Sequence, residues 1–294
     1  MGVLFGLGQS LCWALTTALL RSLSDRLDAF LLNGLRAAMA LCIIMPLVAL
    51  RGAWDQYQLV TASRFALLSG SVLVGGVIGD VCYLKSLKTL GVGRAFPVTN
   101  TYPLLTVLLS AALLGTAITL RVVAGGLLVI AGVYAIARPR PSRTVDGLHR
   151  LPRAALARGL LMALATALCW SFATIILAEA LEGIDGVVAT SVRVPVVAAV
   201  SLTAAARRGQ LAQLCNLGRK AWVQLVLTGI LGWGLGGTLY ALAVQTAGPG
   251  RTAILSATSP LFGLLFASLF LGERPHVLAI VGTLLTVVGV VLVA

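Results

Sequence analysis

The first half of the chain is repeated in the second half at a constant offset of 157 residues, and this duplication constrains every fold that the chain can adopt. Trp13 corresponds to Trp170, and Arg36 corresponds to Arg193. Because the alignment has no gap, a structure proposed for one half must also fit the other. The repeat predicts three parts: a unit at 1–137, a basic loop at 138–157 and a second unit at 158–294.

Long apolar stretches recur in both units and indicate that the chain lies in a membrane. Hydrophobic residues make up 59% of the sequence and charged residues 11%, whereas an ordinary soluble domain has roughly 25% charged residues. A helix of roughly 20 apolar residues crosses a hydrocarbon core of about 30 Å. The stretches that meet this description, five in each unit, are 3–20, 29–50, 65–84, 95–114, 121–137, 159–178, 187–206, 222–244, 252–271 and 276–293.

The apolar runs are continuous rather than alternating, which excludes a transmembrane β-barrel. We therefore predict an all-α polytopic membrane protein with ten transmembrane helices in two five-helix repeats. The first stretch lacks a basic segment and a cleavage site, so it is predicted to be a span and not a removed signal peptide. A re-entrant hairpin is the alternative for the shortest stretch, 121–137.

An odd number of spans in each unit means that the two units enter the membrane from opposite sides. Inverted repeats of this kind are common in secondary transporters, where the substrate site lies near the middle of the membrane. The loops on one face carry sixteen Lys and Arg residues, and those on the other carry four. The positive-inside rule then predicts that the first face is cytoplasmic and that both termini lie outside.

The net charge of +13 has the same explanation, because the basic residues flank the spans. Their expected partner is anionic lipid, and no nucleic-acid-binding module is present. The five cysteines have no metal-ligand spacing, and no Gly-rich phosphate loop occurs. We therefore expect no metal, no cofactor and no catalytic residues. An intramembrane enzyme is disfavoured because no Ser/His, paired-Asp or metal constellation is present.

Short motifs where the third and fourth spans meet carry a family resemblance. Gly91-Val92-Gly93-Arg94 is followed by Asn100-Thr101-Tyr102-Pro103, and the second unit repeats the pattern as Gly248-Pro249-Gly250-Arg251 and Thr258-Ser259-Pro260. With a Trp in the first span and an Arg early in the second, the chain resembles the EamA-type branch of the drug/metabolite transporter superfamily. The resemblance covers nearly the whole chain and implies export of amino acids or related metabolites.

The sequence departs from the family pattern at two points. Members often carry an acidic residue after the Gly that ends the fourth helix of a unit, and Thr116 replaces it in the first unit. Members are also usually drawn with cytoplasmic termini, whereas the charge count places both termini outside.

Three charged residues lie well inside predicted spans, where each needs a partner or a wet cavity. Arg36 and Arg193 correspond to each other, and we expect each to form a structural or gating ion pair, Arg36 with Asp25 or Asp28 and Arg193 with Glu182 or Asp185. The alternatives are that the Arg36 side chain snorkels to the membrane surface, or that the arginines contact the substrate directly. Asp80 corresponds to Gly237 and so serves no symmetric purpose. An apolar environment favours the neutral form of a carboxyl group. We therefore predict that Asp80 couples transport to protons or binds a substrate ammonium group. A helix cap, or a permanent pair with Lys85 or an Arg, is the alternative.

Other polar and aromatic residues inside the spans are predicted to line a substrate cavity. They are Gln9, Trp13, Asn33, Tyr83, Asn100, Thr101, Tyr102, Trp170, Tyr240, Thr258 and Ser259. For Ser and Thr the alternative is hydrogen bonding between helices, and for Trp and Tyr it is anchoring at the membrane surface.

Glycines and prolines suggest where the helices bend. Tight turns, and therefore hinges, are predicted at Gly91, Gly93, Gly248 and Gly250. Proline removes a helical hydrogen bond, so kinks are expected at Pro103 and Pro260.

These features predict a multi-pass carrier in a bacterial inner membrane that moves a small organic solute, such as an amino acid, by alternating access. Proton coupling is expected through Asp80. The alternatives are an importer of a vitamin-like or nucleoside-like metabolite, a multidrug efflux carrier, and a non-transporting scaffold or flippase. Ten helices can enclose a site in one chain, so a monomer suffices, with a homodimer as the alternative.

Overall fold

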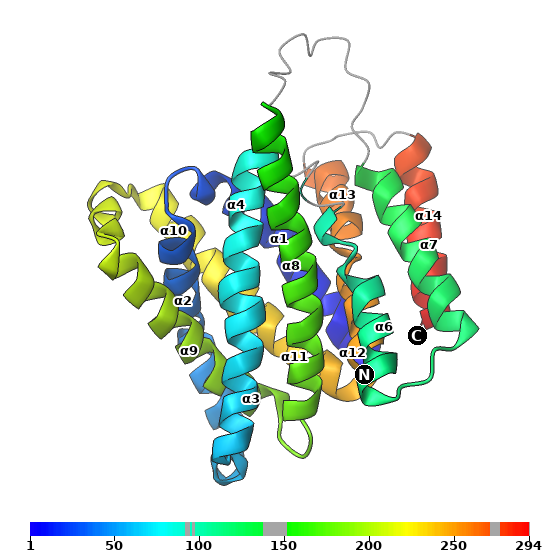
Figure 1. Ribbon diagram of the computed structural model, residues 1–294, viewed down its shortest axis with the longest axis horizontal. Helices are drawn as coiled ribbons and strands as arrows, with labels where there is room; N and C mark the ends of the chain where they lie inside the picture. Colours follow the sequence, from blue (N-terminus) through cyan, green and yellow to red (C-terminus); the bar gives the residue numbers. More distant parts are fainter. Residues whose placement is uncertain (92–94, 96–97, 138–151, 271–276, 294) are drawn as a thin grey trace.

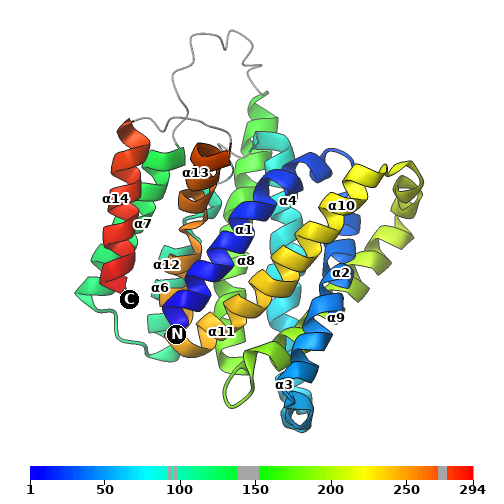
Figure 2. The same ribbon diagram turned by 180° about the vertical axis from the view of Figure 1, so that it is seen from behind.

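The computed structural model describes residues 1–91, 95, 98–137, 152–270 and 277–293. Within these ranges the chain forms helices and the turns between them, with no strand (Figures 1 and 2). The expected all-helical fold is confirmed. Gly93 and residues 138–151 of the predicted basic loop lie outside the described residues.

Helices of the first half follow one another in the order expected from the apolar stretches. Their bounds are α1 Gly2–Ser24, α2 Ala29–Leu50, η1 Ala53–Leu59, α3 Ala62–Val72, η2 Leu73–Gly79, α4 Asp80–Leu90, α6 Tyr102–Leu114 and α7 Leu120–Ala137.

The second half shows the same succession of elements. Their bounds are α8 Arg153–Ala180, α9 Gly186–Arg207, η3 Gln210–Asn216, α10 Arg219–Thr228, η4 Gly229–Gly236, α11 Gly237–Ala247, α12 Pro249–Ser256, α13 Ser259–Phe270 and α14 Val277–Val293. Helix α8 begins at Arg153, so the end of the predicted loop at 138–157 is helical instead. Its sequence, rich in Ala, Leu and Arg, strongly favours helix once Pro152 has been passed.

Among the described residues, five helical segments are long and apolar enough to cross a membrane: Ala29–Leu50, Ala62–Leu90, Arg153–Ala180, Gly186–Arg207 and Arg219–Ala247. Helix α7 is continuous from Leu120 to Ala137, which argues against the re-entrant hairpin there. The predicted span 252–271 is not one helix, because α12 ends at Ser256 and α13 begins at Ser259. Pro260 has no N–H to continue the ladder of α12, so the chain starts a new helix.

The distribution of side chains is that of a membrane protein. Large apolar side chains such as Leu113, Leu284 and Val291 are exposed, while polar ones such as Asn33 and Thr106 are fully buried. Water would disfavour such an apolar surface, and lipid stabilises it. The protein is therefore a polytopic helical membrane protein.

Each half contains a π-helical segment at the corresponding position of its third long helix. Segment η2 joins α3 to α4, and η4 joins α10 to α11. Both are rich in glycine, and π-helical turns occur frequently at functional sites. Asp80 is the first residue after η2, and Gly237 is the first after η4.

Helices α2 and α9 pack against each other, and the same contacts occur at both ends of the pair. The Asp28 N–H donates to Gln213 Oε1 at 2.8 Å, and the Asp185 N–H donates to Gln56 Oε1 at 2.8 Å. Each aspartate also caps its own helix by accepting a backbone N–H. Since all four residues follow the offset of 157, each contact is the repeat of the other.

Helices α7 and α14 form a second close pair at one edge of the molecule (Figure 1). A Cβ atom on Gly132 would lie 2.5 Å from the carbonyl oxygen of Gly282, and one on Gly289 would lie 2.6 Å from that of Gly125. The backbones therefore approach so closely that only glycine fits, as is common between membrane helices.

We expect Gly132→Ala to destabilise this pair, because its methyl group would meet backbone atoms that cannot move aside. The midpoint of thermal unfolding in detergent should fall, corresponding to a loss of about 1–3 kcal/mol. Gly263→Ala in α13 is the matched control, since a Cβ atom there meets nothing within 4 Å. Equal melting curves for the two variants would contradict the assigned packing.

Candidate functional site

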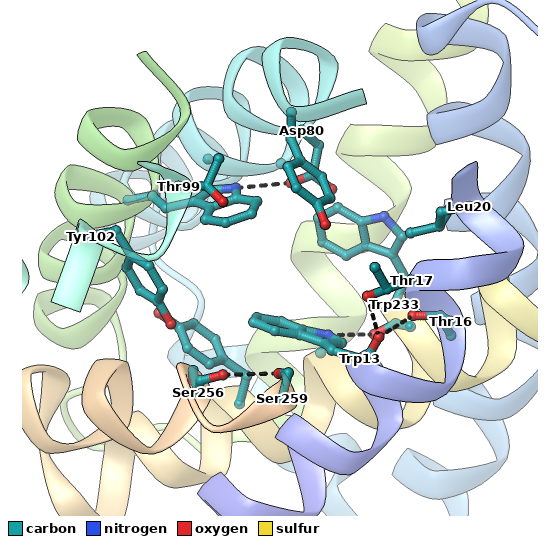
Figure 3. A pocket seen from close by; sticks show the side chains of 18 of the residues that line it. Trp13, Thr16, Thr17, Leu20, Asp80, Thr99, Tyr102, Trp233, Ser256 and Ser259 are labelled. Carbon is teal, nitrogen blue, oxygen red and sulfur yellow. Dashed lines mark hydrogen bonds between the residues drawn. The ribbon is translucent and has the colours of Figure 1, made fainter. Parts of the chain in front are cut away.

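A pocket of about 150 Å³ lies among the helices and is lined by residues from both halves. Figure 3 shows Asp80, Thr99 and Tyr102 on one side of the open space and Trp13, Ser256 and Ser259 on the other. A cavity of this size accommodates a solute of about the size of benzene. The predicted site residues that line it are Trp13, Arg36, Asp80, Tyr83, Asn100, Tyr102, Trp170, Arg193, Tyr240 and Ser259.

Two ring pairs form much of the pocket wall. The ring centroids of Trp13 and Tyr240 are 5.5 Å apart, and those of Tyr83 and Trp170 are 5.1 Å apart. Each pair joins the two halves and is the repeat of the other. A ring of Tyr102 meets Trp170 edge-on at 5.6 Å. These aromatic faces give the pocket a mainly apolar surface suited to a flat or amphipathic solute.

The indole N–H groups of the two corresponding tryptophans have different acceptors. Trp13 Nε1 donates to the carbonyl oxygen of Gly232 in η4 at 3.3 Å. Trp170 Nε1 instead donates to Asp80 Oδ1 at 3.0 Å. Asp80 therefore breaks the correspondence between the halves at the pocket wall. Of the two permanent partners considered from the sequence, Lys85 or an arginine, Asp80 interacts electrostatically with an arginine, Arg36, in addition to accepting the Trp170 hydrogen bond.

The two buried arginines do not form the ion pairs expected from the sequence. Arg193 Nε donates to Ser71 Oγ at 3.1 Å, while Asp185 pairs with Arg51. Arg36 lines the pocket, and it interacts electrostatically with Asp80 rather than with Asp25 or Asp28. Sequence reasoning failed here because helix rotation, which the sequence does not fix, turns both arginines inward.

Trp233 is a pocket residue that the sequence did not predict. Its Nε1 donates to Asn33 Oδ1 at 3.2 Å, and Asn33 Nδ2 in turn donates to the carbonyl oxygen of Gly76 in η2. A Cβ atom on Gly76 would collide with the Trp233 ring. Asn33 thus holds the ring against η2 from behind the pocket wall. The available signal was that Trp233 corresponds to Gly76, a large residue opposite the smallest.

Three further predicted cavity residues lie behind the wall. Gln9 is fully buried and accepts a hydrogen bond from Ser256 Oγ, which lines the pocket. Thr101 and Thr258 donate to backbone carbonyls of Val98 and Leu255. The alternative considered from the sequence was hydrogen bonding between helices, but both of these bonds are local, each to the carbonyl three residues earlier in the chain.

The predicted turns occur at two of the glycines. Gly91 and Gly248 both have positive φ angles, of 75° and 83°, which favour glycine. Gly250 does not form a tight turn between helices, because it is already the second residue of helix α12. Pro103 lies at the start of α6, and Pro260 lies at the start of α13. Hinge motion at these residues remains a prediction.

Several hydroxyl groups of the pocket lining were not predicted from the sequence. Thr174 Oγ1 hydrogen-bonds Tyr240 Oη, and Thr17 corresponds to Thr174 in the other half. Their recurrence at the repeat offset was the signal that could have identified them. The unpredicted polar lining residues are Thr16, Thr17, Thr99, Thr174 and Ser256. In the part of the chain that the structure describes, no group of three His, Cys, Asp or Glu residues could hold a metal.

Fold and site together define a helical membrane protein with a central pocket that is accessible to a small molecule. The model of the EamA-like transporter family matches residues 1–138 and again residues 157–294. The chain belongs to the EamA-like transporter family.

Two individual proteins are similar over almost the full length. An uncharacterized transporter of Archaeoglobus fulgidus is 26% identical over 291 residues, covering 99% of this chain and 96% of that protein. A crystal structure described only as that of a protein matches with a TM-score of 0.76 and 23% identity, covering 99% of this chain and 95% of that one. The second likeness supports the fold.

Replacing Asn33 with Leu should destabilise the pocket wall, since it removes the acceptor of Trp233 and the donor to Gly76 together. Leaving such groups unpaired costs about 1–3 kcal/mol, so the thermal midpoint in detergent should fall. Thr190→Val is the matched control, because Thr190 corresponds to Asn33, but its described hydrogen bond stays within its own helix, to the carbonyl oxygen of Gly186. A midpoint for Asn33→Leu no lower than that of the control would refute the role of Asn33.

Proposed function

We propose that this protein is a secondary transporter that exports small organic metabolites, such as amino acids, by alternating access. Membership in a transporter family supports the class of activity. The observation that carries the proposal is the central pocket, whose wall combines rings with a few polar and charged groups from both halves. This composition is typical of sites that bind one small solute reversibly.

The proposal includes ten transmembrane helices in two inverted repeats at 1–137 and 158–294. The shared succession of elements supports it, as does the direction of the first helix of each half. Helix α1 starts at the same end as the C-terminus, whereas α8 starts at the opposite end (Figure 2). A pseudo-twofold axis in the membrane plane would superpose each half on the other. It would therefore turn the Trp13–Tyr240 pair into the Trp170–Tyr83 pair, and the two pairs have similar ring distances.

Alternating access requires two arrangements of similar free energy. In an inverted repeat each half can adopt the conformation of the other, and this exchange opens the pocket to the opposite side. We propose that this change occurs at the break between α12, which ends at Ser256, and α13, which begins at Ser259, and at the turns of Gly91 and Gly248.

A non-transporting scaffold or flippase fits the pocket less well. Such proteins would present polar grooves to lipid, whereas the polar groups here converge on an internal pocket. An importer of vitamin-like or nucleoside-like metabolites and a multidrug carrier are distinguished from the proposed exporter by measurements of flux.

The basic loops predict that both termini lie outside the bacterial inner membrane. A reporter fused after Ala294 should then be active only if it functions outside. We expect an alkaline phosphatase fusion to be active and a green fluorescent protein fusion to lack fluorescence. The opposite pattern would show that the positive-inside count fails for this protein and that the family topology holds.

The functional test is counterflow of a labelled metabolite panel, led by aromatic amino acids, in proteoliposomes with and without a proton gradient. We expect uptake to respond to the gradient in the wild type, because Asp80 is proposed to gain and lose a proton during the cycle.

Asp80→Asn keeps the shape but removes the titration, so gradient-driven accumulation should fall at least about tenfold, while exchange of substrate for substrate persists. Asp55→Asn, at an exposed position in η1, is the control and should behave as the wild type. Unchanged pH dependence in Asp80→Asn would eliminate proton coupling through this residue. The absence of flux for every panel member would count against transport itself.

A further inference from the structure

Arg36 and Arg193 occupy corresponding positions, but their surroundings differ. Arg193 Nε donates to Ser71 Oγ at 3.1 Å, and Ser71 Oγ also donates to the carbonyl oxygen of Leu68. Thr228 is the counterpart of Ser71, and its hydroxyl donates to the carbonyl oxygen of Leu225 in the same way. The hydrogen bond from arginine to hydroxyl is not repeated, because Arg36 Nε has no hydrogen-bond partner among the described residues.

Arg36 is deeply buried and lies at the pocket. Only 6% of the Arg36 residue surface is exposed. Its Nη2 lies close to Gly232, where a Cβ atom would be 2.8 Å away. Gly232 also lines the pocket, so the guanidinium rests on the glycine-rich backbone of η4. An unpaired N–H on a buried guanidinium is costly, so an acceptor bound by this guanidinium would be correspondingly favourable.

The charges around the pocket favour an anionic acceptor. Its described lining contains two arginines and one aspartate, a formal charge of +1. Arg36 and Asp80 interact electrostatically, but the hydrogen bond that Asp80 accepts comes from Trp170. One carboxylate on the solute would supply the acceptor for Arg36 and neutralise the pocket.

We propose that Arg36 is the anion-binding residue of the pocket and selects solutes that carry a carboxylate attached to an aromatic or apolar body. This inference rests on the proposed transport function and gives the chemical class of the solute. Arg193, held by Ser71, is a fixed part of the wall. The planar guanidinium of Arg36 binds both carboxylate oxygens of the solute. The aromatic or apolar body of the solute lies among the rings of Trp13, Trp170 and Tyr240.

The test is isothermal titration calorimetry on the purified full-length protein with four probes that share one ring. Phenylacetate carries the carboxylate alone, phenylalanine carries a carboxylate and an ammonium group, phenylacetamide is neutral and phenethylamine is cationic. Both carboxylates should bind more tightly than the amide and the amine. The comparison of phenylacetate with phenylalanine shows whether a plain acid or an amino acid is preferred, with Asp80 available to the ammonium group.

Arg36→Gln should weaken binding of both carboxylates by about 10- to 100-fold, the loss expected for one charge-assisted contact, and leave phenylacetamide unaffected. Arg36→Lys should restore part of the affinity. Arg251→Gln, which removes an exposed arginine outside the pocket, is the control and should bind as the wild type.

A second variant tests the mechanism without removing Arg36. Thr228→Asp would place a carboxylate beside Arg36, at the position that corresponds to Ser71 beside Arg193. This aspartate should pair with Arg36 and so exclude the carboxylate probes. Thr228→Val removes only the hydroxyl and should bind normally.

Two outcomes would overturn the inference: no preference for the carboxylates, including no binding of any probe, or equal carboxylate affinity in Arg36→Gln and the wild type. Counterflow in proteoliposomes separates this failure from that of the proposed function. Flux without a preference for carboxylates rejects the anion site and retains the transporter. Carboxylate binding that depends on Arg36, without flux of any solute, retains the site and rejects transport.

Discussion

The constraint on which the structure depends is that polar groups surrounded by lipid-facing helices must find their partners inside the molecule. Backbone groups are paired by helix formation, but side chains such as Asn33 and Arg193 need contacts with other helices. Asn33 bonds both Gly76 and Trp233, and Arg193 bonds Ser71. Because these partners lie far apart in the sequence, the polar contacts fix how the halves pack around the pocket.

The helix pairs that form the scaffold repeat between the two halves, whereas the pocket contains residues at which the halves differ. The α2–α9 and α7–α14 pairs repeat their contacts almost atom for atom, as membrane helices with small residues can. At the pocket the correspondence fails at a few residues. Asp80 stands opposite Gly237, and Trp233 stands opposite Gly76. The two sides of the pocket therefore present different groups, as recognition of a solute without twofold symmetry would require.

The sequence predicted much of the site because intramembrane charges and rings are expensive to place without a purpose. Asp80, Arg36 and both Trp–Tyr pairs were found on this basis, and all line the pocket. It did not predict Trp233, nor did it predict that Gln9 and Asn33 lie one layer behind. A shift of one residue along a helix turns a side chain by about 100°, so composition identifies polar residues but not the direction in which they point.

The sequence by itself determined the helical class, the membrane location and the twofold repetition, because these follow from the length, apolar character and offset of its segments. Tertiary structure decided the breaks in the helices, the π-helical segments and the partners of the buried charges. The physical reason is range. Hydrophobicity and backbone hydrogen bonding act within one segment. The pairing of Arg193 with Ser71, and the lack of such a partner for Arg36 Nε in the described part of the chain, depend instead on how separate helices are rotated against each other.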